Sequence, residues 1–371
     1  MRRAILLGCT GSIGTTAIQA IQEKHLDIQV VALSAHKDYP KLFALATRLS
    51  VEAVCLTGGS CPSCGEFSTF SSVSGLKQML DSVDADIVLN AIAGFDGLEA
   101  TLACIERGFD VALANKESVV CGGSYLFDVA QEHNVRIIPV DSEHSAIHEL
   151  LRHRSKVDVD SLVITASGGP FRDLPLDAFP SITVEQALRH PTWQMGKKIT
   201  IDSATLANKA LEVIEASYLF GFSPDKIEVV IHPQSIVHSM IRLKDGALYA
   251  QLGKPDMTLP IVNALIEGSE CLVSPLSFDH LQLTFDKPDT SRFPLLGLAF
   301  SILRRKGGTP IAFNAADEVA VHAFLEKQCS YSQMISAIQK TLDKDWGPKV
   351  LDFEQTFEVD RKARALARSF L

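Results

Sequence analysis

The chain has 371 residues, a formal net charge of −9, and 46% hydrophobic against 21% charged residues. This balance is typical of a globular protein with two or three domains and excludes an intrinsically disordered chain. The acidic charge, without extended Lys/Arg clusters, argues against nucleic acid or an anionic membrane as a partner.

Residues 1–140 alternate short apolar runs with amphipathic stretches, which predicts a doubly wound, Rossmann-like parallel sheet. The opening Met1–Gly8 leads directly into the first strand, so we expect neither a signal segment nor a membrane span. The predicted strands are Ala4–Leu7, Gln29–Leu33, Ala53–Leu56, Asp86–Leu89, Val111–Leu113 and Arg136–Val140. The predicted helices are Thr15–Glu23, Lys41–Leu49, Gly75–Ser82, Gly97–Arg107 and Tyr125–Glu132. The Cys- and Ser-rich stretch 57–72 is predicted to be an irregular excursion.

A glycine-rich turn, Gly8-Cys-Thr-Gly11-Ser-Ile-Gly14, joins the first strand to the first helix. Glycines allow a tight turn, and the free N–H groups at a helix N-terminus favour an anion, so the turn predicts a dinucleotide pyrophosphate site. The alternative is a turn that needs glycine for steric reasons alone.

The second strand ends at Ser34, followed by His36, Lys37 and Asp38. An NAD site usually has a carboxylate at this tip, whereas Ser34, His36 and Lys37 can accept a 2′-phosphate, which favours NADP. Asp38 either opposes that phosphate or caps the next helix.

Asn115-Lys116-Glu117 follows the strand Val111–Leu113, at the sheet edge where ligands bind in such folds. A lysine there can hold a substrate oxygen or phosphate, while Asn115 and Glu117 can contact the cofactor. A solvated helix start is the alternative interpretation.

Two acidic segments follow. Asp141 and Glu143 are two residues apart, so an extended strand end is expected to aim both carboxylates the same way. In Ser203–Glu212, Asn208 and Lys209 precede Glu212 by four and three residues, which makes them neighbours on one helical face. Three carboxylates with nearby hydroxyl, amide and ammonium groups suit a hard divalent cation shared with a phosphorylated substrate. Beside a nucleotide-binding fold, they predict a metal-dependent reductase.

The second half is predicted to be mixed α+β followed by a small helical end. Leu162–Thr165 is a predicted strand, and Ile227–Leu243 and Ala247–Leu252 flank the hairpin signal Asp245-Gly246. The predicted C-terminal helices are Leu295–Arg305, Ala315–Glu326, Tyr331–Leu342 and Glu358–Ser369. We therefore predict a nucleotide domain at 1–141, a catalytic domain at 142–265, a connector at 266–294 and a helical domain at 295–371.

The eight cysteines lie mostly among apolar neighbours, which predicts buried free thiols in a reducing cytoplasm. They are Cys9, Cys55, Cys61, Cys64, Cys104, Cys121, Cys271 and Cys329. Cys61 and Cys64 form a CxxC pair without further ligands at zinc spacing. We interpret this pair as part of a variable loop, with a zinc or redox role as the less favoured alternative.

Several segments in order resemble the 1-deoxy-D-xylulose 5-phosphate reductoisomerases. They are GCTGSIG, NKE, VDSEHSAI (140–147), TASGGPF (165–171), HPTWQMG (190–196), DSATLANKALEVIEA (202–216), HPQSIVHSM (232–240), GKPDM (253–257) and NAADEVAVHAF (314–324). That family uses NADPH and Mg²⁺ or Mn²⁺ to convert 1-deoxy-D-xylulose 5-phosphate into 2-C-methyl-D-erythritol 4-phosphate in non-mevalonate isoprenoid synthesis. The resemblance implies a small phosphorylated ketose as substrate and a homodimer. It agrees with the cytoplasm expected from the cysteines and with the charge, which argues against nucleic acid or a membrane as partner.

The resemblance also implies a role for each matching residue. The implied metal ligands are Asp141, Glu143 and Glu212, and Lys116 and His190 join them as catalytic residues. The implied substrate contacts are Lys116, Ser142, Glu143, Ser167, His190, Trp193, Ser203, Asn208, Lys209 and Glu212. The implied cofactor contacts are Thr10, Gly11, Ser12, Ile13, His36, Lys37, Asp38, Asn115, Glu117 and Gly196.

His190–Gly196 matches the mobile lid of that family, in which Trp193 and Met195 would cover the substrate and exclude water. Core packing of both side chains is the alternative. The chain departs from the family pattern at Cys9, His36, Asp38 and Ala210, and the second and third of these leave the detailed 2′-phosphate contacts open. His232 and His238 are interpreted as strand residues with local hydrogen bonds rather than as ligands.

Two other functions remain as alternatives. One is an ordinary NADP-dependent dehydrogenase of the homoserine or semialdehyde type, in which the carboxylates are structural. The other is a non-catalytic, NADPH-binding redox sensor, which has no use for three acidic side chains and a hydroxyl-rich phosphate pocket. Oxidation of NADPH by the deoxyxylulose phosphate, with and without EDTA, separates the three.

Overall fold

The structure is a computed structural model that describes residues 1–152, 154–266, 273–347 and 352–371. The chain divides into two compact units. The first comprises Met1–Ser118, Ser124–Ser145 and Asp256–Ser274, and the second comprises Val119–Gly123, Ala146–Pro255 and Pro275–Leu371. This grouping differs from the four predicted segments, whose boundaries stay a prediction. Cys271 and part of the predicted connector lie outside the described residues.

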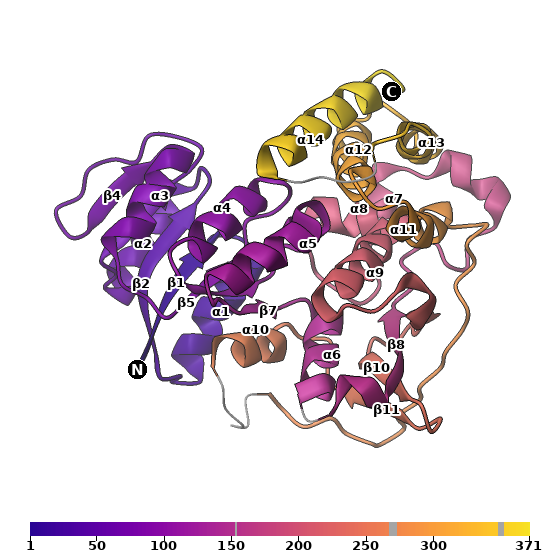
Figure 1. The fold of residues 1–371 in the computed structure, drawn as a ribbon, viewed down its shortest axis with the longest axis horizontal. Coiled ribbons are helices and arrows are strands. Elements are labelled where there is room, and N and C mark those ends of the chain that lie inside the picture. The colour runs from indigo at the N-terminus through magenta and orange to yellow at the C-terminus, as the bar shows by residue number, and fades with distance from the viewer. Residues whose placement is uncertain (153, 267–272, 348–351) are drawn as a thin grey trace. The chain divides into compact units, whose positions relative to one another are not determined.

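The first unit is built on a seven-stranded sheet in the order β4-β3-β2-β1-β5-β6-β7, with every described pairing parallel (Figure 1). Its strands are β1 (Arg2–Leu7), β2 (Ile28–Ala35), β3 (Ala53–Leu56), β4 (Ser68–Ser71), β5 (Ile87–Asn90), β6 (Asp110–Leu113) and β7 (Ile137–Pro139). The strand order reverses beside β1, which lies between β2 and β5. This is the topological switch point where doubly wound sheets bind ligands, at the carboxyl ends of the strands.

Six of the seven strands match the predicted ones, which confirms the doubly wound sheet. The stretch 57–72 was predicted to be irregular, and this is wrong at its end, where Ser68–Ser71 forms β4 beside β3. The sequence carries no apolar run there because β4 is an edge strand in which no residue is fully buried.

The first unit contains the five predicted helices, as α1 to α5, and two that were not predicted, α6 and α10. They are α1 (Ser12–Glu23), α2 (Tyr39–Leu49), α3 (Ser72–Ser82), α4 (Asp96–Ile105), α5 (Lys116–Glu132), the start of α6 (Ser142–Arg152), and α10 (Thr258–Leu265). Helix α5 kinks at Gly123, which adopts φ 53° and ψ −144°. Ile261, Val262 and Leu265 of α10 belong to the same buried cluster as Ala17 and Ile18 of α1, so this late segment completes the core of the first unit.

The second unit contains a mixed sheet in the order β11-β10-β8-β9. Its strands are β8 (Val159–Ala166), β9 (Ile227–Ile231), β10 (Val237–Leu243) and β11 (Leu248–Leu252); only β8 and β9 run parallel. The predicted hairpin at Asp245-Gly246 is confirmed between β10 and β11. The predicted arm Ile227–Leu243 is wrong as one strand, because the chain leaves β9 at His232-Pro233 and re-enters the sheet as β10.

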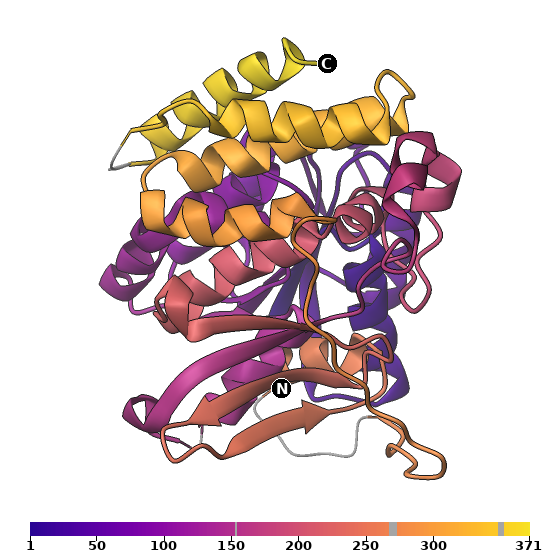
Figure 2. The ribbon, with the colours of Figure 1, turned by 90° about the vertical axis from the view of Figure 1, so that its right-hand side faces the viewer.

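Helices cover this sheet in layers (Figure 2). They are α7 (Val184–Ala187), α8 (Lys197–Thr205), α9 (Ala207–Phe220), α11 (Pro294–Arg305), α12 (Thr309–Leu325), α13 (Tyr331–Leu342) and α14 (Phe353–Arg368), with short 3₁₀ turns η1 (Lys156–Asp158), η2 (Leu176–Ser181) and η3 (Pro224–Lys226). Helix α9 lies between the sheet and the C-terminal helices and contacts both β9 and α11. The four predicted C-terminal helices are confirmed, although α12 and α14 begin earlier than expected. The described connector residues 273–293 contain no helix or strand, and Asp286 forms an isolated β-bridge with Ile231.

The seven cysteines among the described residues are all free thiols, and five of them are buried. Cys61 and Cys64 are partly buried and pack against the core of the first unit. Within the described ranges, no helix is long and apolar enough to cross a bilayer.

Candidate active site

The glycine turn after β1 is shaped by close backbone contacts. Gly8 adopts φ +75°, and a Cβ there would lie 2.5 Å from the carbonyl oxygen of Ala91. A Cβ on Gly14 would lie 2.5 Å from Cys9 Cα, so both glycines are needed by the turn itself. Gly11 precedes α1, and no side chain of the described residues caps this helix. The exposed first turn of α1 therefore keeps its N–H groups as donors for an anion.

The residues at the end of β2 differ in their exposure to solvent. Ser34 is buried, and its hydroxyl accepts a hydrogen bond from the Gly8 N–H at 3.2 Å. The Ser34 hydroxyl therefore supports the glycine turn, and its predicted contact with the 2′-phosphate stays a prediction. His36, Lys37 and Asp38 are exposed, and the Asp38 carboxylate accepts from the Lys41 N–H at 3.1 Å. Asp38 thus caps α2, which was one of its two predicted roles.

Lys41 is a residue that the sequence did not identify. Its Nζ donates to the Thr10 carbonyl oxygen at 2.9 Å and lies 3.4 Å from Thr15 Oγ1. The ammonium therefore ties α2 to the glycine turn. No local sequence pattern predicts this contact, because 31 residues separate Lys41 from Thr10.

Asn115 is buried at the start of α5 and is held by several hydrogen bonds. Its Nδ2 donates to the carbonyl oxygens of Ile92 and Gly94 at 2.7 and 2.8 Å, and lies 3.0 Å from Glu117 Oε2. Its Oδ1 accepts from the Ser118 N–H at 2.8 Å, which caps the helix. The Asn115 amide thus fixes both the preceding loop and Glu117, while its cofactor contact stays a prediction.

Lys116 and the acidic segment meet within the first unit. Lys116 Nζ forms an ion pair with Asp141 Oδ2, and their side chains are 7% and 16% exposed. Ser142 Oγ donates to Glu143 Oε2. The expectation of an extended strand end at Asp141–Glu143 is wrong, because β7 ends at Pro139 and α6 begins at Ser142. A helix start therefore positions these side chains, and its dipole favours the Glu143 carboxylate.

In the second unit, Ser167 and His190 are hydrogen-bonded to each other. His190 Nδ1 accepts from the backbone N–H groups of Thr192 and Trp193 at 3.1 and 2.9 Å, so the ring proton is carried by Nε2. Nε2 then donates to Ser167 Oγ at 3.0 Å. Burial lowers the pKa of His190 to about 4, which makes it a neutral donor near pH 7.

The Ser167 loop lies against α8. Gly169 adopts φ +68°, and a Cβ there would lie 2.6 Å from the Ser203 carbonyl oxygen. The glycine therefore allows backbone contact between the loop that carries Ser167 and the helix that carries Ser203. Two predicted substrate-binding hydroxyls are thereby brought onto neighbouring segments.

Glu212 lies on α9 with both of its predicted neighbours. Asn208 Nδ2 donates to Glu212 Oε1 at 2.5 Å, and Lys209 Nζ forms an ion pair with Glu212 Oε2. The predicted helical face is confirmed, although Ser203–Glu212 is not one helix. Leu206, at φ 58°, separates α8 from α9. Glu212 and Lys209 are buried, so the carboxylate is held in one orientation.

The segment 190–196 contains no helix or strand, and Gly196 forms the N-cap of α8. Trp193 and Met195 are partly exposed, so neither is a fully packed core side chain. His232 follows β9; its Nδ1 lies 2.8 Å from the Thr284 carbonyl oxygen, and its Nε2 accepts from the Ile236 N–H at 3.2 Å. This agrees with a local structural role for His232.

The chain is similar to proteins of one kind along its full length. Family models described as 1-deoxy-D-xylulose 5-phosphate reductoisomerase, its C-terminal domain, and DXP reductoisomerase C-terminal domain match residues 4–123, 137–220 and 252–366. A 1-deoxy-D-xylulose 5-phosphate reductoisomerase of Trichlorobacter lovleyi is 42% identical, over 99% of this chain and 97% of that protein. The one from Treponema pallidum is also 42% identical, over 100% of this chain and 97% of its own length.

Solved structures of the same kind share the fold. The Zymomonas mobilis reductoisomerase in complex with NADPH has a TM-score of 0.91 at 38% identity, covering 99% of this chain and 98% of that one. A reductoisomerase in complex with NADPH, fosmidomycin and magnesium has a TM-score of 0.91 at 34% identity, covering 100% and 98%. These similarities agree with the observed architecture of both units.

Proposed function

Because the chain belongs to the 1-deoxy-D-xylulose 5-phosphate reductoisomerase family, we propose that it converts 1-deoxy-D-xylulose 5-phosphate into 2-C-methyl-D-erythritol 4-phosphate with NADPH and a divalent cation. The observation that carries this proposal is 42% identity over the full length of named reductoisomerases. The complexes of solved relatives with NADPH and magnesium support the choice of cofactors. The reaction is an early step of non-mevalonate isoprenoid synthesis.

The proposed metal ligands are Asp141, Glu143 and Glu212, and their donor set fits Mg²⁺ or Mn²⁺ because each offers carboxylate oxygen. When bound, such an ion supplies a Lewis acid for the carbonyl oxygen of the substrate. Lys116 pairs with Asp141, and Lys209 pairs with Glu212. Each ammonium thus lies beside one of the carboxylates that would hold the cation.

Lys116 is proposed to act on the reacting oxygens of the substrate as well as on Asp141. Its ammonium is compact and buried, so it can stabilise negative charge that develops on a substrate oxygen. Ser142, which donates to Glu143, is proposed to bind a substrate hydroxyl from the same helix start.

The proposed phosphate pocket consists of Ser167, His190, Ser203, Asn208 and Lys209. His190 is neutral near pH 7, so it contributes an Nε2–H donor rather than a charge. The positive charge in this set is therefore that of Lys209. The contact of Gly169 with the Ser203 carbonyl supports a shared pocket for the two serine hydroxyls.

The segment 190–196 is proposed to close over the bound substrate. The two N–H bonds to His190 Nδ1 fix Thr192 and Trp193 relative to the ring. A substrate bound by His190 would thereby position Trp193 and, beyond it, Met195. Closure by these side chains excludes water from the reactive aldehyde intermediate.

On the cofactor side, Thr10, Gly11, Ser12 and Ile13 are proposed to bind the pyrophosphate at the start of α1. His36 and Lys37 are proposed to bind the 2′-phosphate, and the capping role of Asp38 supports this because its carboxylate is directed to the Lys41 N–H. Asn115, Glu117 and Gly196 are proposed to lie on the nicotinamide side. When bound, NADPH would supply the hydride, and these residues are proposed to orient the nicotinamide ring.

Absorbance at the reduced nicotinamide band tests the proposal. The purified chain with the deoxyxylulose phosphate and Mg²⁺ is expected to oxidise NADPH, and EDTA is expected to stop it until Mg²⁺ is restored. Oxidation that persists after exhaustive chelation would instead indicate an ordinary dehydrogenase. NADPH binding without any oxidation would indicate a non-catalytic binding protein.

The chain is further proposed to act as a cytoplasmic homodimer. The free thiols of the described cysteines fit a reducing compartment, and the family resemblance supports the dimer. Light scattering after size-exclusion chromatography is expected to give twice the chain mass, and a mass equal to one chain would contradict the dimer.

A further inference from the structure

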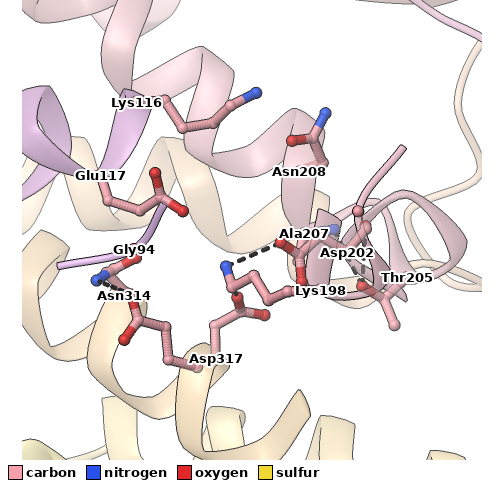
Figure 3. Close-up of polar contacts among 12 residues, drawn as sticks. Gly94, Lys116, Glu117, Lys198, Asp202, Thr205, Ala207, Asn208, Asn314 and Asp317 are labelled. Atoms are coloured by element: carbon pink, nitrogen blue, oxygen red, sulfur yellow. Dashed lines mark hydrogen bonds and ion pairs between the residues drawn. The ribbon is translucent and has the colours of Figure 1, made fainter. Parts of the chain in front are cut away.

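A buried charge cluster connects the end of the 190–196 segment to the C-terminal helices. Lys198 lies in the first turn of α8, and its Nζ lies 2.8 Å from Asp202 Oδ2 and 2.7 Å from Asp317 Oδ2 (Figure 3). The side chains of Asp202 and Asp317 are 2% and 0% exposed, and that of Lys198 is 21% exposed. One ammonium thus joins α8 to α12 across 119 residues of sequence.

The cluster restricts how α8 can move. Removing Lys198 would leave two buried carboxylates without this counter-charge, which is strongly unfavourable. The pairing with Asp202 also holds one turn of α8, since the two residues are four apart. The first turn of α8 therefore cannot unwind or rotate without separating buried charges.

Helix α8 transmits this restraint to both of its ends. At its start, the Gly196 carbonyl oxygen accepts from Thr200 N–H and from Thr200 Oγ1 at 2.8 Å. At its end, Thr205 Oγ1 donates to the Asp202 carbonyl oxygen at 3.1 Å and accepts from the Ala207 N–H at 3.2 Å. Helix α8 thus begins directly after the last residue of the 190–196 segment, and Thr205 at its end is hydrogen-bonded to Ala207, the residue before Asn208.

We propose that Lys198, Asp202 and Asp317 are positioning residues that fix the C-terminal hinge of the lid at Gly196. The fixed hinge confines the motion to 190–196 and keeps the closing segment in register with Ser203 and Asn208. This inference rests on the proposed function, because the lid is part of that function. Helix α12, although far from the lid in sequence, would thereby have a role in lid closure.

The test uses Trp193 as a reporter of the lid. The chain has two tryptophans, and Trp346→Phe leaves Trp193 as the sole one. In this background, Asp317→Asn and Lys198→Met are compared with Asp360→Asn. Asp360 is a matched control because it is also a buried aspartate of the helical end, and its ion pair, at 2.7 Å, is with Arg364 of the same helix, α14.

Trp193 fluorescence is titrated with a phosphonate hydroxamate at saturating Mg²⁺ and NADPH, and steady-state rates are measured at 25 °C. Asp317→Asn and Lys198→Met are expected to raise the half-saturating concentration and the KM for the phosphorylated ketose about tenfold, with a smaller fall in kcat. Asp360→Asn is expected to lower Tm while leaving the half-saturating concentration and the KM within about twofold of the parent values. The effects of Lys198→Met and Asp317→Asn are expected to be non-additive in the double variant, since they remove one shared interaction.

Three results obtained with folded variants would overturn the inference. The first is an Asp317→Asn chain that binds and turns over like its parent. The second is an Asp360→Asn chain that disturbs the lid equally, and the third is additive behaviour of the double variant. If Asp317→Asn does not fold, Lys198→Met carries the comparison, and if neither folds the cluster is a stability element and the inference is wrong. A parent chain that does not oxidise NADPH refutes the proposed function instead.

Discussion

Substitution of Glu212 by Gln isolates the charge of one proposed metal ligand. The side chain is 1% exposed, and both of its oxygens are already engaged, by Asn208 and by Lys209. Glutamine has the same shape and keeps one acceptor oxygen, so the packing of α9 is preserved. What is lost is the carboxylate charge that a divalent cation and Lys209 both require.

The magnitude follows from these contacts. A catalytic metal is worth several kcal/mol of transition-state stabilisation, and a loss of about 4 kcal/mol corresponds to roughly a thousandfold in turnover. Lys209 would keep its burial but lose its counter-charge, which costs up to about 3 to 5 kcal/mol of stability. The Gln oxygen still accepts a hydrogen bond, so we expect the lower end of that range and a Tm only several degrees lower.

The assay pairs NADPH oxidation with NADPH binding measured by cofactor fluorescence. Glu212→Gln is expected to lose turnover by about a thousandfold while its NADPH affinity changes less than about threefold, because no proposed cofactor contact lies on α9. Equal loss of turnover and NADPH affinity would refute the assignment of Glu212 to the metal. Turnover within tenfold of the parent would refute it as well.

Three further predictions follow from individual side chains and the proposed pocket. The pKa of His190 is lowered from 6.5 to about 4, so between these pH values the unfolded chain binds more protons than the folded chain. The free energy of unfolding should therefore fall as pH drops from about 6.5 towards 4. Urea titrations of His190→Gln should show a smaller fall over the same pH range. In steady-state rates, Lys37→Ala should raise the KM for NADPH about tenfold, whereas Asp38→Ala should leave this KM unchanged. In thermal melts, Asp38→Ala should destabilise α2 by about 1 kcal/mol through loss of the helix cap. An equal effect of the two variants on the KM would contradict the capping role of Asp38. A phosphonate hydroxamate should inhibit competitively with the ketose phosphate only when Mg²⁺ is present, and inhibition that survives chelation would exclude a metal-bound hydroxamate.

Local spacing correctly predicted the part of the site that lies on α9. Asn208, Lys209 and Glu212 meet because helical geometry places residues three and four apart on one face, whatever surrounds them. The same reasoning failed at Asp141 and Glu143, because it assumed a strand where α6 begins. Periodicity over a few residues does not distinguish a strand end from a helix start.

The sequence alone determined the doubly wound sheet, the glycine turn, the hairpin at Asp245-Gly246 and the helical C-terminal part, since each follows from a pattern of neighbouring residues. The tertiary structure decided which backbone groups these polar side chains bind: Ser34 accepts from the Gly8 N–H, and Asp38 accepts from the Lys41 N–H at the start of α2. It also decided the link between Lys198 and Asp317, which are 119 residues apart. Ion-pair partners this far apart in sequence are determined by tertiary packing and by the free-energy cost of burying an unpaired charge. Neither can be predicted from the neighbouring residues.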